Sequence, residues 1–274
     1  MKILVLGKNG MLGSMVYRYL SGRYKVDGTT REQLNAETTD IKELMDITRG
    51  YDWVINCIGV IMHLIDESPG SKQKAILVNA IFPIRLGMTG VKIIQIETDC
   101  VYDGFDGDYT EDDLHNAVDI YGKTKSLGEF PFSNVIHLRN SIIGPGNEKA
   151  LFDWFLNQKE ATGFANHFWN GITTLHFAKL CEGIIKNDFE TGFSQHIVPA
   201  DWVTKYRLLK YINEIYGKNI KITLGYDQLK VNRILDTNNR DRNNLLWKMA
   251  GYKTPPTIRE MVRELYKNTN ISRS

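Results

Sequence analysis

A short buried strand that runs into a glycine-rich turn constrains this chain more than any other feature. The strand predicted at 2–6 reads KILVL, and Gly7-Lys8-Asn9-Gly10-Met11-Leu12-Gly13 follows it directly. Apolar residues then recur at helical spacing over 11–20. Glycines in such a turn let the backbone approach a pyrophosphate, which the helix N-terminus can bind. The pattern predicts a dinucleotide site, although GxxGxxG differs from the usual GxGxxG, and a plain strand–turn–helix is the alternative.

The remainder of the first half alternates apolar strands with helical stretches, which is typical of a parallel α/β sheet. Strands are expected from 24–26 onward and at 53–58, 92–96 and 135–138, with helices at 41–49, 75–86 and 120–130. After a turn-rich stretch at 144–146, the pattern predicts helices at 151–156, 175–185, 204–216 and 257–266 and a short strand at 220–224. We therefore expect a doubly wound Rossmann sheet over 1–150, with a contribution from about 172–198. A smaller mixed α/β substrate-binding region would occupy 151–274, and a cleft would separate the two.

Composition narrows the classes of function. Among the 274 residues, Lys and Arg exceed Asp and Glu by 34 − 32 = 2, so no basic stripe points to nucleic acid. No apolar run reaches the ~18 residues of a membrane span. Cysteines at 57, 100 and 181 and six histidines without paired spacing predict neither a disulfide framework nor a metal site. A cytoplasmic protein is expected, and a homodimer is the base-rate expectation for its assembly.

Two further motifs carry residues suited to catalysis. Tyr121 and Lys125 lie four residues apart, so they share one face of the predicted helix. An ammonium beside a phenol stabilises the phenolate and lowers the tyrosine pKa from ~10, which suits a general acid or base. Thr98 follows the strand predicted at 92–96, where a hydroxyl could bond a substrate carbonyl. Taken singly, these residues could equally be a surface pair and part of an ordinary polar loop.

Together and in this order, the motifs resemble the extended short-chain dehydrogenase/reductase family, and within it the dTDP-4-dehydrorhamnose reductase group. The resemblance rests on the glycine turn, TDCVYDG at 98–104, YTEDD at 109–113, YGKTKSLGE at 121–129 and LRNSIIG at 138–144. It covers roughly the first 145 residues. It implies NADPH-dependent reduction of the 4-keto group of a nucleotide-activated 4-keto-6-deoxy sugar, which supplies a deoxyhexose donor for polysaccharide or glycan synthesis.

The resemblance also implies roles for individual residues. Tyr121 would protonate the carbonyl oxygen as hydride arrives, Lys125 would lower the pKa of Tyr121 and hold the nicotinamide ribose, and Thr98 would bind the same oxygen. Asp40 and Ile41 would contact adenine, and Asn79 would be linked to Lys125 through water. The full cofactor set would be Gly7, Asn9, Gly10, Met11, Leu12, Gly13, Thr30, Arg31, Asp40, Ile41, Cys57, Ile58, Gly59, Asn79, Tyr121 and Lys125.

The substrate end carries less specific signals. Besides Thr98 and Tyr121, the candidates for contact with the nucleotide sugar are Asp99, Cys100, Arg139, Trp154, Trp169, Asn170 and Arg233. An aromatic ring can stack on a base, and Arg233 could pair with a diphosphate. Core packing for the aromatic residues and a surface position for Arg233 are the alternatives.

Two residues depart from the pattern of the reductase group. Glu97 stands before Thr98, where the group usually has serine. A carboxylate there could point away from the site or alter its charge. Cys100 replaces an aromatic residue, and we interpret it as a small apolar filler rather than a reactive thiol.

Cofactor choice depends on where the second strand ends. Sites for NAD place an acid there to bind the ribose 2′-OH, whereas sites for NADP use small residues and a nearby arginine. If the strand ends at Gly28, then Thr29, Thr30 and Arg31 could hold a 2′-phosphate. If Asp27 ends the strand, NAD is favoured. We expect NADP, with NAD as the alternative.

Two other functions remain open at this stage. Some relatives of the reductase group are regulatory subunits that bind a dinucleotide without turning over a sugar, and others are nucleotide-sugar epimerases that retain NAD. A dehydratase is disfavoured because the Asp-Glu pair that usually follows the threonine is replaced by Asp99-Cys100. The motifs do not specify the nucleotide, the sugar or the stereochemistry of the product.

Overall fold

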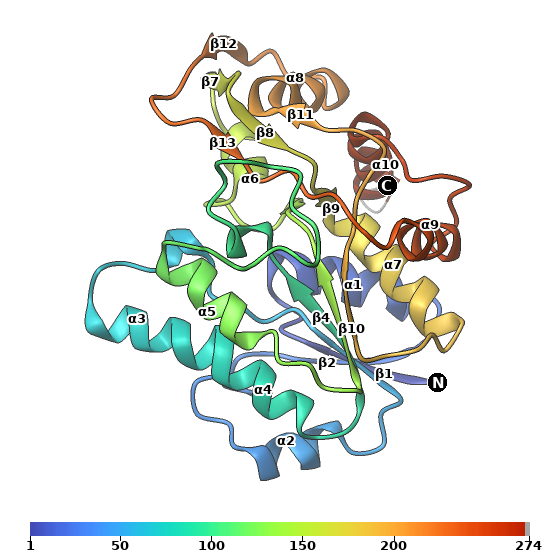
Figure 1. Ribbon diagram of the computed structural model, residues 1–274. Coiled ribbons are helices and arrows are strands. Elements are labelled where there is room, and N and C mark those ends of the chain that lie inside the picture. The colour runs from blue at the N-terminus through green and yellow to red at the C-terminus, as the bar shows by residue number, and fades with distance from the viewer. Residues whose placement is uncertain (272–274) are drawn as a thin grey trace.

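A six-stranded parallel sheet forms the centre of the computed structural model, which describes residues 1–271 (Figure 1). The strand order is β10-β5-β4-β3-β1-β2. The strands are β1 (Lys2–Leu6), β2 (Lys25–Thr29), β3 (Trp53–Asn56), β4 (Lys92–Glu97), β5 (Val135–Arg139) and β10 (Phe193–His196). The expected doubly wound Rossmann sheet is confirmed. After β1, the chain adds β2 on one side of β1 and then continues with β3 on the other side. The gap between β1 and β3 is therefore the point where the strand order switches, and a ligand crevice forms beyond the carboxyl ends of the strands at such a point.

Each face of the sheet has its own apolar core, because alternate strand residues point to opposite sides. Val5 and Ile55 belong to the core that includes residues of α1 (Met11–Ser21) and α7 (Thr174–Lys186). Leu6 and Val54 belong to the opposite core, with residues of α2 (Ile41–Thr48) and α4 (Phe82–Gly87). Figure 1 shows α1 and α7 on one side of the sheet and α3, α4 and α5 on the other.

The helix expected at 75–86 is longer and has three parts. It begins as α3 (Pro69–Ile76), where Ser68 caps the N-terminus by accepting a hydrogen bond from the Ser71 N–H. A π-helical segment, η2 (Leu77–Ile81), then leads into α4. Segments of this kind often occur at functional sites, and this one carries Asn79. The second catalytic motif lies on α5 (Ile120–Gly128), whose N-terminus is capped by Asp119.

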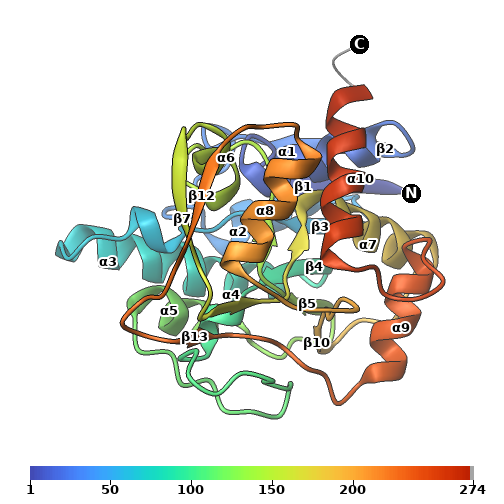
Figure 2. The same ribbon diagram turned by 90° about the horizontal axis from the view of Figure 1, so that it is seen from above.

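Most of the second half of the chain, apart from α7 and β10, forms small sheets and helices above the carboxyl edge of the large sheet (Figures 1 and 2). Two short pairs are β6 (Ile142–Ile143) with β9 (Ile172–Thr173) and β7 (Glu160–Phe164) with β12 (Lys221–Gly225). A third sheet joins β8 (His167–Trp169) to β11 (Val203–Thr204) and β13 (Val231–Asn232). The remaining helices are α6 (Leu151–Leu156), α8 (Lys205–Ile215), α9 (Arg240–Met249) and α10 (Ile258–Ile271), and two 3-10 turns are η1 (Met62–Leu64) and η3 (Asp99–Val101). Within residues 1–271, no helix has the length and apolarity needed to cross a membrane.

Candidate active site

The glycine turn after β1 has a backbone geometry that side chains would prevent. Gly7 has φ of +78°, a left-handed conformation that glycine adopts without strain. The Gly10 N–H donates to the Gly7 carbonyl at 3.0 Å. A Cβ at Gly13 would lie 2.1 Å from that same carbonyl oxygen. The turn therefore brings the N-terminus of α1 directly against the end of β1.

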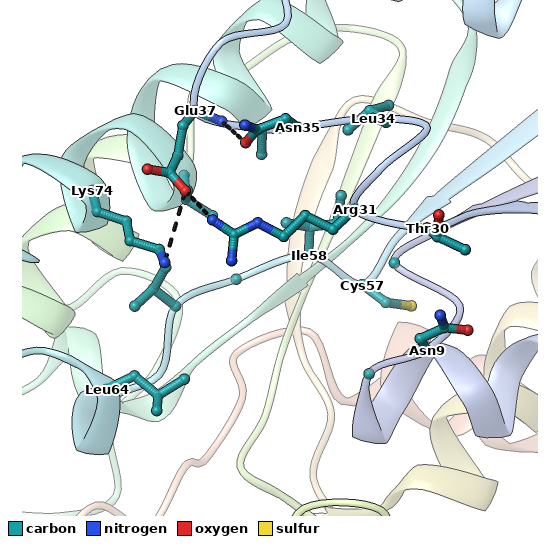
Figure 3. Close-up of a pocket in the computed structure, with 16 residues that line it drawn as sticks. Asn9, Thr30, Arg31, Leu34, Asn35, Glu37, Cys57, Ile58, Leu64 and Lys74 are labelled. Carbon is teal, nitrogen blue, oxygen red and sulfur yellow. Dashed lines mark hydrogen bonds and ion pairs between the residues drawn. The ribbon is translucent and has the colours of Figure 1, made fainter.

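A cavity of about 310 Å³ opens beside this turn, between the segments that follow β2 and β3 (Figure 3). Eight predicted cofactor residues line it, namely Gly7, Asn9, Gly10, Thr30, Arg31, Cys57, Ile58 and Gly59. Met11, Leu12 and Gly13 lie in the first turn of α1 and do not line it. The sequence analysis missed several lining residues, among them Leu34, Asn35, Ala36, Glu37, Val60 and Lys74.

Asp40 and Ile41, expected at adenine, do not line the cavity and require a correction. Asp40 is the N-cap of α2, where its carboxylate accepts from the Glu43 N–H at 2.9 Å and the Glu43 carboxylate accepts from the Asp40 N–H. This reciprocal capping box uses the polar groups of Asp40 to start the helix. Asn35 and Ala36, five residues earlier, line the cavity instead.

Charged side chains form one end of the cavity. Figure 3 shows the Glu37 carboxylate between Arg31 and Lys74, at 2.7 Å and 3.7 Å respectively. The strand β2 ends at Thr29, so the alternative in which Asp27 ends it is wrong. Asp27 accepts a hydrogen bond from the Tyr51 hydroxyl at 2.8 Å and is not among the residues that line the cavity.

Asn79 is buried in a set of hydrogen bonds behind the cavity. Its side-chain oxygen accepts from the Val60 N–H at 2.8 Å, and its amide donates to the Val60 carbonyl at 2.9 Å. The amide also lies 3.3 Å from the Thr124 hydroxyl on α5. Asn79 therefore joins the segment after β3 to the helix that carries Tyr121, and in this structure its direct partner there is Thr124 rather than Lys125.

Close packing of α5 on η3 brings the second and third motifs together. A Cβ at Gly122 would lie 2.1 Å from the Cys100 carbonyl oxygen, so only glycine permits this approach. Tyr121, next to Gly122, is half-buried, and Thr98 is buried. The Thr98 hydroxyl also accepts from the Cys100 N–H at 3.2 Å. Thr98 and Tyr121 thus lie at the carboxyl edge of the sheet, beyond the end of β4.

The pKa of Tyr121 is raised in the structure, whereas the sequence analysis expected Lys125 to lower it. Burial raises the pKa of Tyr121, and the Thr98 hydroxyl opposes this rise. The Lys125 ammonium, expected to lower the pKa of Tyr121, instead lies 2.7 Å from the Glu97 carboxylate and donates to the Ile96 carbonyl at 2.8 Å. Tyr121 is consequently a neutral phenol at neutral pH, the form that can give up a proton.

Arg139, expected at the substrate, belongs to a buried network. It is 2% exposed and forms a two-pronged ion pair with Glu129. Its guanidinium also contacts the Tyr102 hydroxyl at 3.1 Å and the His115 ring at 2.8 Å. Because these partners occupy its donors, Arg139 is a structural residue.

Of three other substrate candidates, two are buried in the structure and one lies at the surface. Trp169 is 3% exposed and lies within the core. The Asn170 side chain bonds both the N–H and the carbonyl of Leu235, at 3.0 Å and 2.7 Å, and so fixes the segment after β13. Trp154 lies on α6 and is 41% exposed, so it contributes to the surface rather than to the core.

A pair of cations faces the turn that carries Thr98. Arg233 donates to the carbonyls of Tyr102 and Asp103, both at 3.1 Å, and so clamps this loop. Burial raises the pKa of Asp99, and the charges of Arg233 and Lys205 oppose that rise. The sequence analysis missed Lys205, the first residue of α8, because nothing in the local sequence shows that it lies near Asp99.

The Cys100 thiol, two residues after Thr98, is partly buried. Burial raises the pKa of the Cys100 thiol to about 12, so it stays protonated and weakly nucleophilic at neutral pH. In the described part of the chain, no three His, Cys, Asp or Glu side chains are grouped so that they could hold a metal ion. The glycine turn with its cavity and the Thr98 and Tyr121 hydroxyls thus lie at the same carboxyl edge of the sheet.

Comparison with known proteins agrees with this arrangement. The family model described as RmlD substrate binding domain matches residues 1–139. A dTDP-4-dehydrorhamnose reductase from Mycolicibacterium smegmatis (strain ATCC 700084 / mc(2)155) is 32% identical over 138 residues, and the match covers 47% of this chain. It covers 40% of that relative, so the matched region spans less than half of the relative's length.

Solved structures share the fold over nearly the whole chain. A dTDP-4-dehydrorhamnose reductase from Clostridium acetobutylicum ATCC 824 superposes with a TM-score of 0.80 at 22% identity, covering 98% of this chain and 100% of that one. The dTDP-4-dehydrorhamnose reductase from Bacillus anthracis str. Ames, solved in complex with NADP, gives 0.78 at 16% identity, covering 97% and 99%.

Proposed function

The chain belongs to the family of the RmlD substrate binding domain, and from that premise we propose that it uses NADPH to reduce the 4-keto group of a nucleotide-activated 4-keto-6-deoxy sugar. The observation that supports this most strongly is that Thr98, the N-cap of η3, lies within hydrogen-bonding reach of Tyr121 on α5, at the same sheet edge as the glycine turn. A relative that matches the first half of the chain carries the name dTDP-4-dehydrorhamnose reductase. The product would serve as a deoxyhexose donor in polysaccharide or glycan synthesis.

The residues around the cavity fit NADPH. The glycine turn leaves no Cβ between the helix N-terminus and a pyrophosphate, and Asn35 and Ala36 would lie at adenine. Arg31 and Lys74 already hold one carboxylate between them, and a 2′-phosphate carries the same sign of charge. When bound, NADPH supplies the hydride. A solved relative of the same fold holds NADP.

Tyr121 and Thr98 supply the proton and the hydrogen bonds at the reacting oxygen. Since burial keeps the Tyr121 phenol neutral, its hydroxyl can donate a proton to the carbonyl oxygen as charge develops there. The Thr98 hydroxyl donates to the Asp99 carboxylate at 3.2 Å in this structure and would donate to the same oxygen of a bound sugar. Lys125, one turn after Tyr121 on α5, holds the nicotinamide ribose.

The cations beyond η3 suit the diphosphate of the substrate. Lys205 is the first residue of α8 and lies over the Trp169 ring at 5.4 Å. Arg233 lies across the same loop. Both charges act on Asp99, and these two side chains would neutralise the charge of a nucleoside diphosphate.

The test is the loss of absorbance at 340 nm with NADPH, and separately with NADH, against dTDP-, UDP- and GDP-4-keto-6-deoxyhexoses. Tyr121→Phe removes the proton donor, and Tyr226→Phe is the matched control because Tyr226 is 74% exposed. Turnover by the wild type and by Tyr226→Phe, with loss in Tyr121→Phe, supports the proposal. Binding of NADPH without turnover of any sugar would favour a dinucleotide-binding regulatory subunit, and interconversion of sugars without net cofactor oxidation would favour an epimerase.

A further inference from the structure

The ion pair between Lys125 and Glu97 is almost closed to solvent. The two side chains are 7% and 1% exposed, and their charged atoms lie 2.7 Å apart. The second donor contact of Lys125 goes to the Ile96 carbonyl at 2.8 Å. A buried carboxylate so close to an ammonium would by itself cancel the positive charge near Tyr121. The carboxylate, however, has a second partner.

That partner is His137, whose geometry indicates a doubly protonated ring. The His137 Nδ1 lies 3.1 Å from the Glu97 carboxylate, and its Nε2 lies 3.0 Å from the Phe130 carbonyl oxygen. A carbonyl and a carboxylate can only accept hydrogen bonds. Both ring nitrogens must therefore carry hydrogen, and the ring is an imidazolium. Glu97 thus lies between two cations.

The other charged groups packed around this cluster are already paired. Glu129, at the end of α5, faces both Glu97 and His137 but is neutralised by Arg139. His115 lies beyond Arg139, and its pKa falls to about 4, because of burial first and the Arg139 charge second. His115 is therefore neutral at neutral pH. The net charge on the group Lys125, Glu97 and His137 is +1.

From this geometry we infer that Glu97 is a positioning residue that fixes the Lys125 ammonium, and that protonated His137 is the counter-cation that keeps Glu97 from cancelling it. The inference rests on the proposed function, which gives Lys125 its role beside Tyr121. It explains how a carboxylate can occupy the position before Thr98, where the reductase group usually has serine. Serine would need no counter-cation, whereas a buried carboxylate does.

The shifts in protonation agree with the contacts. Burial alone would lower the pKa of His137, but the hydrogen bond and charge of Glu97 raise it overall. Burial alone would raise the pKa of Glu97, but Lys125 and His137 lower it overall. As pH rises through the pKa of His137, the ring loses a proton and becomes neutral. Lys125 is then the only cation that pairs with Glu97, so the net charge of the three groups falls to zero. Turnover should then decline on the alkaline side.

The first experiment needs no turnover. In the full-length wild-type protein labelled with ¹⁵N-histidine, imidazole nitrogen shifts at pH 7 report whether both nitrogens of His137 carry hydrogen, and His137→Asn assigns the signal. Two protonated nitrogens are expected. A neutral ring at pH 7 overturns the inference, whether or not any sugar is reduced.

The second experiment compares pH profiles of kcat and KM in the wild type, Glu97→Gln, His137→Asn and the double variant. We expect each single change to lower kcat by about tenfold or more, the lower end of acid–base effects, with KM changed less than about threefold. His137 acts through Glu97, so adding His137→Asn to Glu97→Gln should have little further effect on kcat. The alkaline decline should disappear in all three variants.

The outcomes are distinguishable from failure of the proposed function. Absence of turnover in the wild type contradicts the proposed function, and the nitrogen shifts still decide the charge of His137. With turnover present, independent and multiplicative effects of the two changes, or an unaltered pH profile in His137→Asn, overturn the inference. His176→Asn, in a second Glu–His pair far along the chain, is the matched control and should leave kcat within about twofold. If Glu97→Gln does not fold, the pH profile of His137→Asn and the nitrogen shifts of the wild type still test the inference.

Discussion

Two carboxylates in this molecule have nearly the same partners and very different surroundings. Glu97 contacts Lys125 and His137, while Glu264 contacts Lys179, His176 and the Tyr252 hydroxyl. We call these groups the β4 cluster and the α10 cluster. The side chain of Glu97 is 1% exposed and that of Glu264 is 36% exposed. The β4 cluster lies directly before Thr98 and on the helix that carries Tyr121, whereas the α10 cluster joins α10 to α7.

The comparison shows how the partner of the second ring nitrogen determines the charge of a histidine that contacts a carboxylate. His176 places Nε2 3.1 Å from Glu264, but its Nδ1 lies 2.7 Å from the Thr173 hydroxyl. A hydroxyl can donate, so His176 can accept there and remain neutral. His137 has a carbonyl in the corresponding place and cannot. Accordingly, burial lowers the pKa of His176 despite Glu264, while Glu97 raises the pKa of His137.

The largest expected difference between the clusters is in catalysis. Lys125→Met removes the ammonium beneath Tyr121 and should lower kcat by about 10²–10⁴-fold, the range of acid–base contributions. Lys179→Met removes the corresponding ammonium of the α10 cluster and should leave kcat within about twofold. Steady-state oxidation of NADPH with the sugar identified in the panel measures both. Similar losses in the two variants would show that the β4 cluster is structural, like the α10 cluster.

The parts of the site that depend on local sequence were predictable. The glycine turn and the Tyr121–Lys125 spacing each lie within one short stretch of chain, so helical periodicity and turn chemistry were enough to predict them. Asp40 was misplaced because the path of the loop after β2 decides which residue reaches the cavity, and Asn35 lies five residues earlier. No local pattern specifies that path.

The charge network was not predictable, because its members come from different elements. Glu97, Lys125 and His137 lie on β4, α5 and β5, and only parallel pairing of the strands under the helix brings them together. The same is true of Arg139, which was assigned to the substrate but pairs with Glu129. Strands β1 to β5 of the large sheet followed from alternating apolar segments, whereas its sixth strand, β10, and the short strands of the second half show no periodicity in the sequence.

The second expected difference is in stability. Glu97→Gln leaves a buried ammonium without its carboxylate and should lower the free energy of unfolding by about 3–5 kcal/mol. Glu264→Gln also removes an ion pair, but the side chain is 36% exposed, so solvent screening reduces the loss to about 1–2 kcal/mol. Urea denaturation at pH 7 measures both, and an equal loss would mean that burial does not distinguish the two clusters.

The third expected difference is in the pH dependence of stability: the contributions of His137 and His176 to the free energy of unfolding should change with pH in opposite directions. Since the folded-state pKa of His137 is raised, its stabilising contribution is complete below the unfolded pKa of ~6.5 and is lost as pH rises through the folded value. The folded-state pKa of His176 is lowered, so its contribution is present above ~6.5 and is lost as pH falls.

Urea denaturation of the wild type, His137→Asn and His176→Asn between pH 5.5 and 8.5 measures how each histidine's contribution to the free energy of unfolding changes with pH. The destabilisation by His137→Asn should be larger at the acid end, and that by His176→Asn should be larger at the alkaline end. As pH rises across the range, the two destabilisations should therefore change in opposite directions. Parallel slopes would contradict the assignment of opposite charge states to the two rings.

The smallest expected effect is that of an exposed ion pair on the free energy of unfolding, and it serves as the reference for the two clusters. Arg259 on α10 and Glu214 on α8 form an ion pair whose side chains are 42% and 60% exposed. In water, such a pair gains little because hydration competes with the contact. Glu214→Gln should therefore change the free energy of unfolding by less than about 0.5 kcal/mol and leave kcat unaltered. Because α10 takes part in both this pair and the α10 cluster, a loss as large as that of Glu264→Gln would mean that docking of α10, rather than burial of charge, determines the stability of the α10 cluster.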